Sequence, residues 1–230
     1  MKKRAQKDVS EQEVHAVFAA LLKLYPDPKT ELNYESPFQL LIAVILSAQC
    51  TDVRVNKTTP ELFKRYPTAD ALAAAPASTV EKIIQSCGFF RAKARAITQC
   101  AKGLVNSFGG SVPKTLEELT TLPGVGRKTA SVVLNQAFNI PAIAVDTHVK
   151  RVSQRLGWAH HPEPDKIEME LREVIPQSLW SIVNSLLILH GRRTCMARKP
   201  ACERCTVTTY CQYFRDVVGK PIKPKSRDAT

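Results

Sequence analysis

One short stretch, residues 122–130, constrains the fold more than any other because it predicts a turn between two helices. It reads Leu-Pro-Gly-Val-Gly-Arg-Lys-Thr-Ala and lies between two runs with apolar residues at helical spacing, 115–122 and 129–138. Proline ends a helix, and the two glycines tolerate backbone conformations that other residues avoid. The stretch therefore predicts a helix–hairpin–helix over about residues 115–138.

The predicted turn suits the binding of a phosphate group. It leads into a helix N-terminus, which has partial positive charge and unpaired N–H donors. We expect the N–H groups of Gly124 and Gly126 to point at a phosphate, with Arg127 and Lys128 adding two cations at the same place. From the hairpin alone, Lys128 is either a phosphate clamp or a reactive amine.

The overall charge of the chain points to a polyanionic partner. The 230 residues carry a formal net charge of +12, and the cations are spread along the sequence. The longest apolar run, 40–46, is too short to span a bilayer. Because the basic N-terminus is followed by no apolar segment, we expect no signal peptide and a location in the cytoplasm, with the nucleoid if the source is bacterial.

The rest of the chain has the apolar spacing of helices. A capping box at 10–13 precedes one helix, and Ser36 and Pro37 fit the start of another, which is apolar nearly all round. No segment shows the period-two alternation of a half-buried strand, so the chain is predicted to be all-α. Further helices are expected over 60–66, 69–75, 78–86, 91–107, 147–156, 165–174 and 177–190, with Gly191 as the stop of the last.

Four cysteines lie close together near the C-terminus. Cys195, Cys202, Cys205 and Cys211 follow the pattern C-x6-C-x2-C-x5-C. Zinc modules usually show two C-x2-C pairs or histidine ligands, whereas this segment has one such pair and no histidine. Iron–sulfur clusters accept four cysteines at irregular spacing, so the pattern favours a [4Fe–4S] cluster over zinc. Basic side chains between the ligands are expected to face phosphate.

Two smaller features are a pair of aromatic residues and three separate cysteines. Phe89 and Phe90 are adjacent in a predicted loop; paired aromatics are commonly core residues, but in a basic protein they can insert between bases. Three cysteines stand apart from the others and are interpreted as buried small side chains: Cys50, Cys87 and Cys100.

The hairpin with its lysine, an aspartate in the run Val-Asp-Thr-His at 145–148, and the four-cysteine segment together resemble the endonuclease III family. These proteins are DNA glycosylase/lyases of the helix–hairpin–helix superfamily. The resemblance covers about residues 10–213, including the runs 47–52 and 189–192.

The resemblance implies two all-α domains with a DNA-binding cleft between them. A six-helix barrel over 30–140 would carry the helix–hairpin–helix. A discontinuous domain of 1–29 plus 141–230 would hold the [4Fe–4S] cluster in its loop 195–211.

The resemblance also implies roles for individual residues. Lys128 matches the family's nucleophile, Asp146 its catalytic carboxylate, and Gln49 the residue that fills the gap left by an extruded base. Phe89 stands where a leucine wedge is common and Arg91 where an asparagine is common, which bears on lesion range and opposite-base preference. The residues expected to contact DNA are Gln49, Phe89, Phe90, Arg91, Leu122, Gly124, Val125, Gly126, Arg127, Arg198 and Lys199.

These residue types suit the chemistry that the resemblance implies. A base must leave the stack before its glycosidic carbon can be reached. A lysine amine can then displace it and form a Schiff base with the sugar, and both the helix N-terminus and Arg127 disfavour the ammonium form of Lys128. Asp146 is expected to stabilise the oxocarbenium-like sugar, although it could simply cap the helix that begins at Thr147.

We therefore expect a bifunctional DNA glycosylase and AP lyase that removes oxidised pyrimidines from duplex DNA, in base excision repair, as a monomer. One alternative is a monofunctional glycosylase of the same superfamily. The other is a non-catalytic iron–sulfur module that binds DNA.

Overall fold

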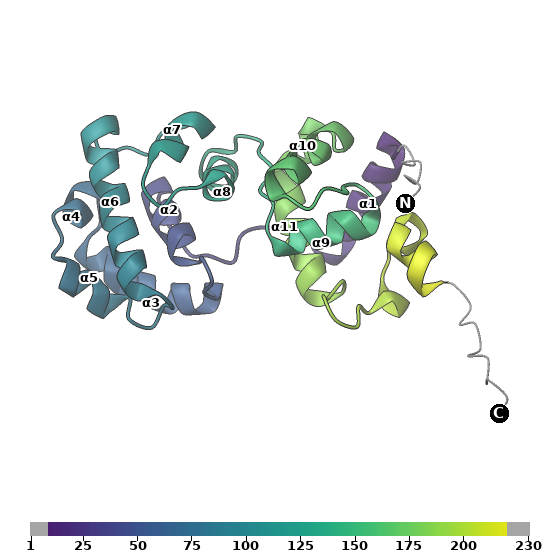
Figure 1. The fold of residues 1–230 in the computed structure, drawn as a ribbon, viewed down its shortest axis with the longest axis horizontal. Coiled ribbons are helices and arrows are strands. Elements are labelled where there is room, and N and C mark those ends of the chain that lie inside the picture. Colours follow the sequence, from purple (N-terminus) through teal and green to yellow (C-terminus); the bar gives the residue numbers. More distant parts are fainter. Residues whose placement is uncertain (1–8, 220–230) are drawn as a thin grey trace, which may run out of the picture. The chain divides into compact units, whose positions relative to one another are not determined.

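A computed structural model describes residues 9–219, and this part of the chain is helical and contains no strand (Figure 1). The all-α prediction is therefore confirmed. The contacts within the chain divide it into two compact units. Unit 1 comprises Met1–Pro28, Val145–Pro176 and Asn184–Thr230, and unit 2 comprises Lys29–Ala144 and Gln177–Val183.

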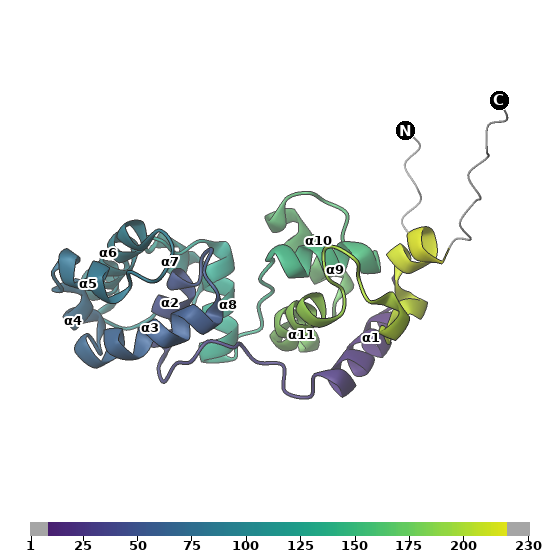
Figure 2. The same cartoon turned by 90° about the horizontal axis from the view of Figure 1, so that it is seen from below.

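Unit 2 is built around one buried helix, α2 (Pro37–Leu46). Every residue from Leu40 to Leu46 is buried, and α2 packs against α3, α6 and α8 (Figure 2). The apolar character of this helix on all sides thus reflects a central position, as predicted. The other helices of the unit are α3 (Asp52–Arg65), α4 (Ala69–Ala73), α5 (Ala77–Ile83), α6 (Phe90–Phe108), α7 (Leu116–Thr121) and α8 (Arg127–Phe138).

Unit 1 joins the N-terminal helix to the C-terminal third of the chain. Its core includes Phe18 and Trp158, whose rings stack with centroids 5.9 Å apart. Its elements are α1 (Glu11–Leu24), α9 (Thr147–Leu156), α10 (Pro164–Val174), most of α11 (Trp180–Arg193), and the short turns η2 (Cys202–Arg204), η3 (Thr208–Tyr210) and η4 (Phe214–Val218). A further turn, η1 (Gln177–Leu179), precedes α11 and belongs to unit 2.

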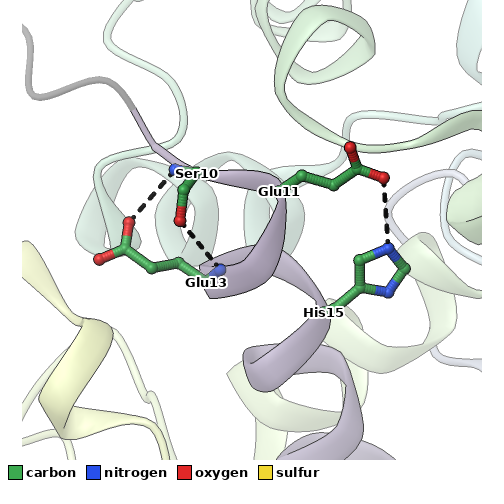
Figure 3. A network of polar contacts seen from close by, with 4 residues as sticks. All are labelled: Ser10, Glu11, Glu13 and His15. Carbon is green, nitrogen blue, oxygen red and sulfur yellow. Dashed lines mark hydrogen bonds and ion pairs between the residues drawn. The ribbon is translucent and has the colours of Figure 1, made fainter.

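The first helix begins with the predicted capping box, drawn in Figure 3. The Ser10 hydroxyl accepts a hydrogen bond from the Glu13 backbone N–H at 3.2 Å, and the Glu13 carboxylate accepts one from the Ser10 N–H at 3.3 Å. One turn further along, His15 lies 3.5 Å from the Glu11 carboxylate. Two of the unpaired donors at this terminus are thereby satisfied locally.

The third helix begins earlier than expected, at Asp52 instead of residue 60. The Thr51 hydroxyl accepts the backbone N–H of Arg54 at 3.3 Å and so caps the helix. Pro60 lies inside the helix, where it removes only one backbone hydrogen bond. The polar run after α2 is therefore the start of α3 as well as the end of α2.

The predicted stop at Gly191 is also wrong, since α11 continues to Arg193. A Cβ atom at position 191 would lie 3.0 Å from His148 Nδ1 and 3.1 Å from Arg151 Nη2. The glycine therefore permits α11 to approach α9 closely, and it does not end the helix.

Among the described residues, no single helix has the length and apolar composition needed to cross a membrane. One bent pair, α10 with the segment Gln177–Arg193, meets the criteria by length and composition only.

Candidate active site and nucleic-acid interface

The hairpin between α7 and α8 leaves several backbone donors open. The side chains of Leu122 and Val125 are buried, and their N–H groups are used inside the hairpin, by Leu119 O at 3.2 Å and Leu122 O at 3.1 Å. In contrast, the N–H groups of Gly124 and Gly126 have no hydrogen-bond partner within residues 9–219. Leu122 and Val125 therefore shape the turn, and the glycines present the donors.

The two glycines serve different purposes. Gly124 has φ +78°, and a Cβ atom there would lie 3.1 Å from Ala96 Cβ, so both the backbone and the packing require glycine. Gly126 has φ −86° and is the N-cap of α8, and a Cβ atom there would meet no protein atom within 4 Å. Because the protein itself does not need glycine at 126, the open space in front of this N-cap suits the close approach of a ligand.

Lys128 is the second residue of α8, and its side chain is exposed. The preceding Arg127 is half-buried. No carboxylate of the described chain forms an ion pair with Lys128. The amine is thus presented to solvent beside the open donors of the turn.

Backbone strain falls on three of the residues expected to contact DNA. Apart from glycines, the described residues with a positive φ, in the left-handed region, are Gln49 (52°), Phe89 (57°), Lys199 (49°) and Asn139 (53°). Asn139 caps the end of α8, a common role for asparagine. For the other three, this backbone costs about 1–2 kcal/mol each, and such strain concentrates at functional positions.

The turns that carry Gln49 and Phe89 lie side by side in unit 2. A Cβ atom at Gly88 would be 3.8 Å from the Gln49 carbonyl oxygen. Gln49 is exposed, and Phe89 is 69% exposed, which is unusual for an aromatic side chain. Phe90 instead packs against the core, and the Arg91 guanidinium lies 5.2 Å from the centre of its ring. The two aromatics thus differ, since only Phe89 points outward.

Asp146 is the N-cap of α9 in unit 1. Its Oδ1 accepts the backbone N–H groups of His148 at 2.8 Å and Val149 at 2.7 Å. The structural interpretation of this residue as a helix cap is therefore confirmed. Its second oxygen, Oδ2, has no hydrogen-bond partner in the described part of the chain, so the fixed carboxylate keeps one oxygen available.

The four cysteines at 195–211 line a single cavity in unit 1, together with His190 and Arg155. Burial raises the pKa of Cys202, Cys205 and Cys211, and the neighbouring thiols raise it further. Four such thiolates need positive charge between them, which iron supplies. In residues 9–219, no three His, Cys, Asp or Glu side chains are grouped to hold a single metal ion; the sulfurs instead surround a common space.

Two arginines that sequence reasoning missed hold the start of this loop. Arg155 donates from Nη1 to Cys195 Sγ at 3.2 Å and Met196 O at 2.8 Å, and from Nη2 to Ala197 O at 3.1 Å. Arg151 donates from Nε to Cys195 O at 3.1 Å. Both lie on α9, one turn apart, in a pattern typical of any solvated helix face, so nothing in the sequence distinguished them.

His190 is a buried polar group beside the loop. It is 2% exposed, its Nε2 lies 3.7 Å from Cys205 Sγ, and burial lowers its pKa to about 4. Burial also lowers the pKa of His148, with Arg151 contributing. Both imidazoles are therefore neutral at pH 7 and serve as packing and hydrogen-bonding groups.

Replacing Arg155 with lysine is expected to weaken retention of the cluster about 10-fold, because an ammonium group cannot reproduce the fork of bonds to Cys195, Met196 and Ala197. Iron content and visible absorbance after incubation with a chelator measure this. The matched control is Arg204→Lys, since Arg204 makes one such bond, to Arg193 O at 3.0 Å. Equal iron loss in both variants would contradict the role of Arg155.

Known proteins match almost the whole chain. A family model described as HhH-GPD superfamily base excision DNA repair protein matches residues 42–177, and one described as the iron–sulfur binding domain of endonuclease III matches residues 195–211. The chain is 51% identical over 201 residues to an endonuclease III of Synechocystis sp., covering 87% of this chain and 92% of the relative. It is 45% identical over 192 residues to endonuclease III of Escherichia coli, covering 84% and 91%.

Solved structures agree with these matches. A trapped endonuclease III–DNA covalent intermediate is 43% identical, with a TM-score of 0.84 over 90% of this chain and 97% of that chain. A non-covalent endonuclease III–DNA complex is 42% identical, with a TM-score of 0.85 over 92% and 99%. The chain therefore belongs to the endonuclease III family, whose members are bifunctional DNA glycosylases and AP lyases of base excision repair, and its cofactor is a [4Fe–4S] cluster.

Proposed function

We propose that this protein removes oxidised pyrimidines from duplex DNA and then cleaves the strand, with Lys128 as the nucleophile. The observation that carries the proposal is the position of Lys128. Its exposed amine stands in the first turn of α8, beside the open N–H groups of Gly124 and Gly126. A phosphate held by these donors would bring the adjoining sugar to the amine.

We propose that DNA is bound by the strained turns at Gln49 and Phe89 and by the basic loop at 195–211. The exposed Phe89 would wedge into the stack while Gln49 fills the space left by the extruded base, which offsets the cost of unstacking, a few kcal/mol. Arg91, Arg127, Arg198 and Lys199 would pair with phosphates. The side chains of Phe90, Leu122 and Val125 are turned inward, so these residues would act by shaping the DNA-contacting turns.

In the proposed reaction the Lys128 nitrogen attacks C1′ of the sugar, the bond from C1′ to the base breaks, and the base leaves with a proton. The sugar ring opens to an iminium ion, which acidifies C2′. Loss of a C2′ proton then breaks the bond from C3′ to its phosphate oxygen. The Asp146 carboxylate, held through Oδ1, would stabilise the positive charge that develops on the sugar. The covalent intermediate trapped between a related endonuclease III and DNA supports a step of this kind.

The cluster is proposed to be held by Cys195, Cys202, Cys205 and Cys211 and to cross-link the loop that presents Arg198 and Lys199. We further propose that unit 2 corresponds to the barrel domain at 30–140, and that unit 1 is the discontinuous cluster domain. We also propose that the protein acts as a monomer, since a single chain carries all these groups, and that it acts on chromosomal DNA inside the cell.

The test uses the purified holoprotein and a duplex with one thymine glycol. We expect strand cleavage, and a covalent protein–DNA adduct when borohydride is present, because borohydride reduces the imine. An undamaged duplex and one with 8-oxoguanine serve as controls for lesion class, and sedimentation tests the monomer. Base release without cleavage or adduct would indicate the monofunctional alternative, and binding without base release would indicate the non-catalytic one.

A further inference from the structure

Two thiols that the proposed reaction does not use lie in the neighbouring turns of unit 2. Cys50 directly follows Gln49, and Cys87 precedes Phe89 by two residues. The turns touch at Gly88, where a Cβ atom would lie 3.8 Å from Gln49 O. Consistent with this contact, burial raises the pKa of the Cys87 thiol and the nearby Cys50 thiol raises it further. Both residues were interpreted from the sequence as isolated buried cysteines, but Cys50 is only half-buried.

The surroundings of the pair are polar and charged. The Cys87 thiol is 1% exposed and donates to Thr58 Oγ1 at 3.9 Å. Lys93, in the first turn of α6, is 6% exposed, and its ammonium group has no hydrogen-bond partner among the described residues. Burial raises the pKa of Cys87 above its ordinary value, and the positive charge of Lys93 lowers it by a smaller effect. An unpaired buried ammonium is costly, and a thiolate beside it would offset that cost.

We propose that Cys50 and Cys87 form a thiol modification site that reacts with small disulfides and closes into a Cys50–Cys87 disulfide. The half-buried Cys50 loses its proton and attacks one sulfur of the small disulfide, releasing one small thiolate and leaving a mixed disulfide. Cys87 then loses its proton and attacks the Cys50 sulfur, releasing the second small thiol. In total, two protein thiols are oxidised, and one small disulfide is reduced to two thiols.

The consequence for DNA binding rests on the proposed roles of Gln49 and Phe89. A disulfide would join the two turns covalently and restrict their adjustment as a base leaves the stack. Because Gln49 and Phe89 would no longer adjust to offset the cost of unstacking, we expect the oxidised protein to bind abasic-site duplex at least about 10-fold more weakly. A reductant should restore the affinity.

The first experiment treats the holoprotein with glutathione disulfide and maps its peptides without reduction. Trypsin places Cys50 in the peptide 30–54 and Cys87 in the peptide 83–91. We expect these two peptides to be joined, and the joining to disappear in Cys50→Ser and in Cys87→Ala. Cys100→Ala is the matched control, because Cys100 is fully buried and burial raises its pKa to about 12. Iron content confirms that the cluster cysteines remain bound.

Three outcomes would contradict the proposed site. These are a mixed disulfide of glutathione that persists on Cys50, disulfides that involve other cysteines, and no reaction with glutathione disulfide. The second experiment compares DNA affinity before and after oxidation in wild type and in Cys50→Ser. If the disulfide forms but affinity is unchanged, the proposed effect on binding is wrong. If the proposed function itself is wrong, the fully reduced protein will not cleave DNA at the lesion. This result differs from a failure of the disulfide to form and from a disulfide without effect on binding.

Discussion

Replacing Lys128 with alanine is expected to abolish the borohydride-trapped adduct and to lower strand cleavage at thymine glycol at least about 10³-fold. The reason is that the imine requires a primary amine at the sugar, and the hairpin presents this one at its open N-terminus. The measurement is single-turnover cleavage, together with gel detection of the covalent complex.

The same variant should keep its fold, because the Lys128 side chain is exposed and its loss leaves no buried gap. We expect the free energy of unfolding to change by no more than about 0.5 kcal/mol. Lys102→Ala is the matched control, since Lys102 is also an exposed helical lysine of unit 2. An adduct that persists in Lys128→Ala would show that another amine forms the imine.

Replacing Asp146 with asparagine is expected to lower the rate of base removal about 10²- to 10³-fold while leaving the stability of α9 unchanged. Asparagine caps a helix as well as aspartate does, so its side-chain oxygen can still accept from His148 and Val149. What disappears is the negative charge that would face the developing cation on the sugar. Single-turnover release of the base measures the first effect, and denaturant unfolding measures the second.

Asp146→Ala separates the two roles of the residue. It removes both charge and cap, so we expect the same loss of base removal plus about 1 kcal/mol of stability. If Asp146→Asn retained wild-type rates while Asp146→Ala lost both activity and stability, Asp146 would be a helix cap with no part in the chemistry.

The features predicted well from sequence are those formed by residues close together in the chain. The capping box at Ser10 and Glu13, the N-cap at Asp146, and the turn conformation at Gly124 each depend mainly on residues close by in the chain. The buried character of α2 was also predictable, since a helix that is apolar on every side has to be enclosed. The order of these local features, with the cysteine pattern, sufficed to identify the family.

The predictions that were wrong or missing concern residues whose role depends on a contact with a residue far away in the sequence. Pro60 and Gly191 were interpreted as helix boundaries, but Pro60 is tolerated inside α3, and Gly191 makes room for His148 and Arg151 of α9. Likewise, Arg155 has the sequence context of a solvated residue, and only folding brings it to the cysteine loop. Such contacts cannot be read from periodicity, because periodicity reports the face of an element and not its neighbour.

The sequence by itself therefore determined the helical class, the hairpin with its lysine, the capped aspartate and the cluster ligands proposed here, because local hydrogen bonding and metal-ligand chemistry depend on residue type and short spacing. The tertiary structure alone decided which side chains face outward. It placed Phe89 in solvent and Phe90 against the core, brought the turn of Cys50 against the turn of Cys87, and left Lys93 buried near Cys87. The physical reason is that exposure and proximity follow from the packing of several helices at once, a property that no single segment carries.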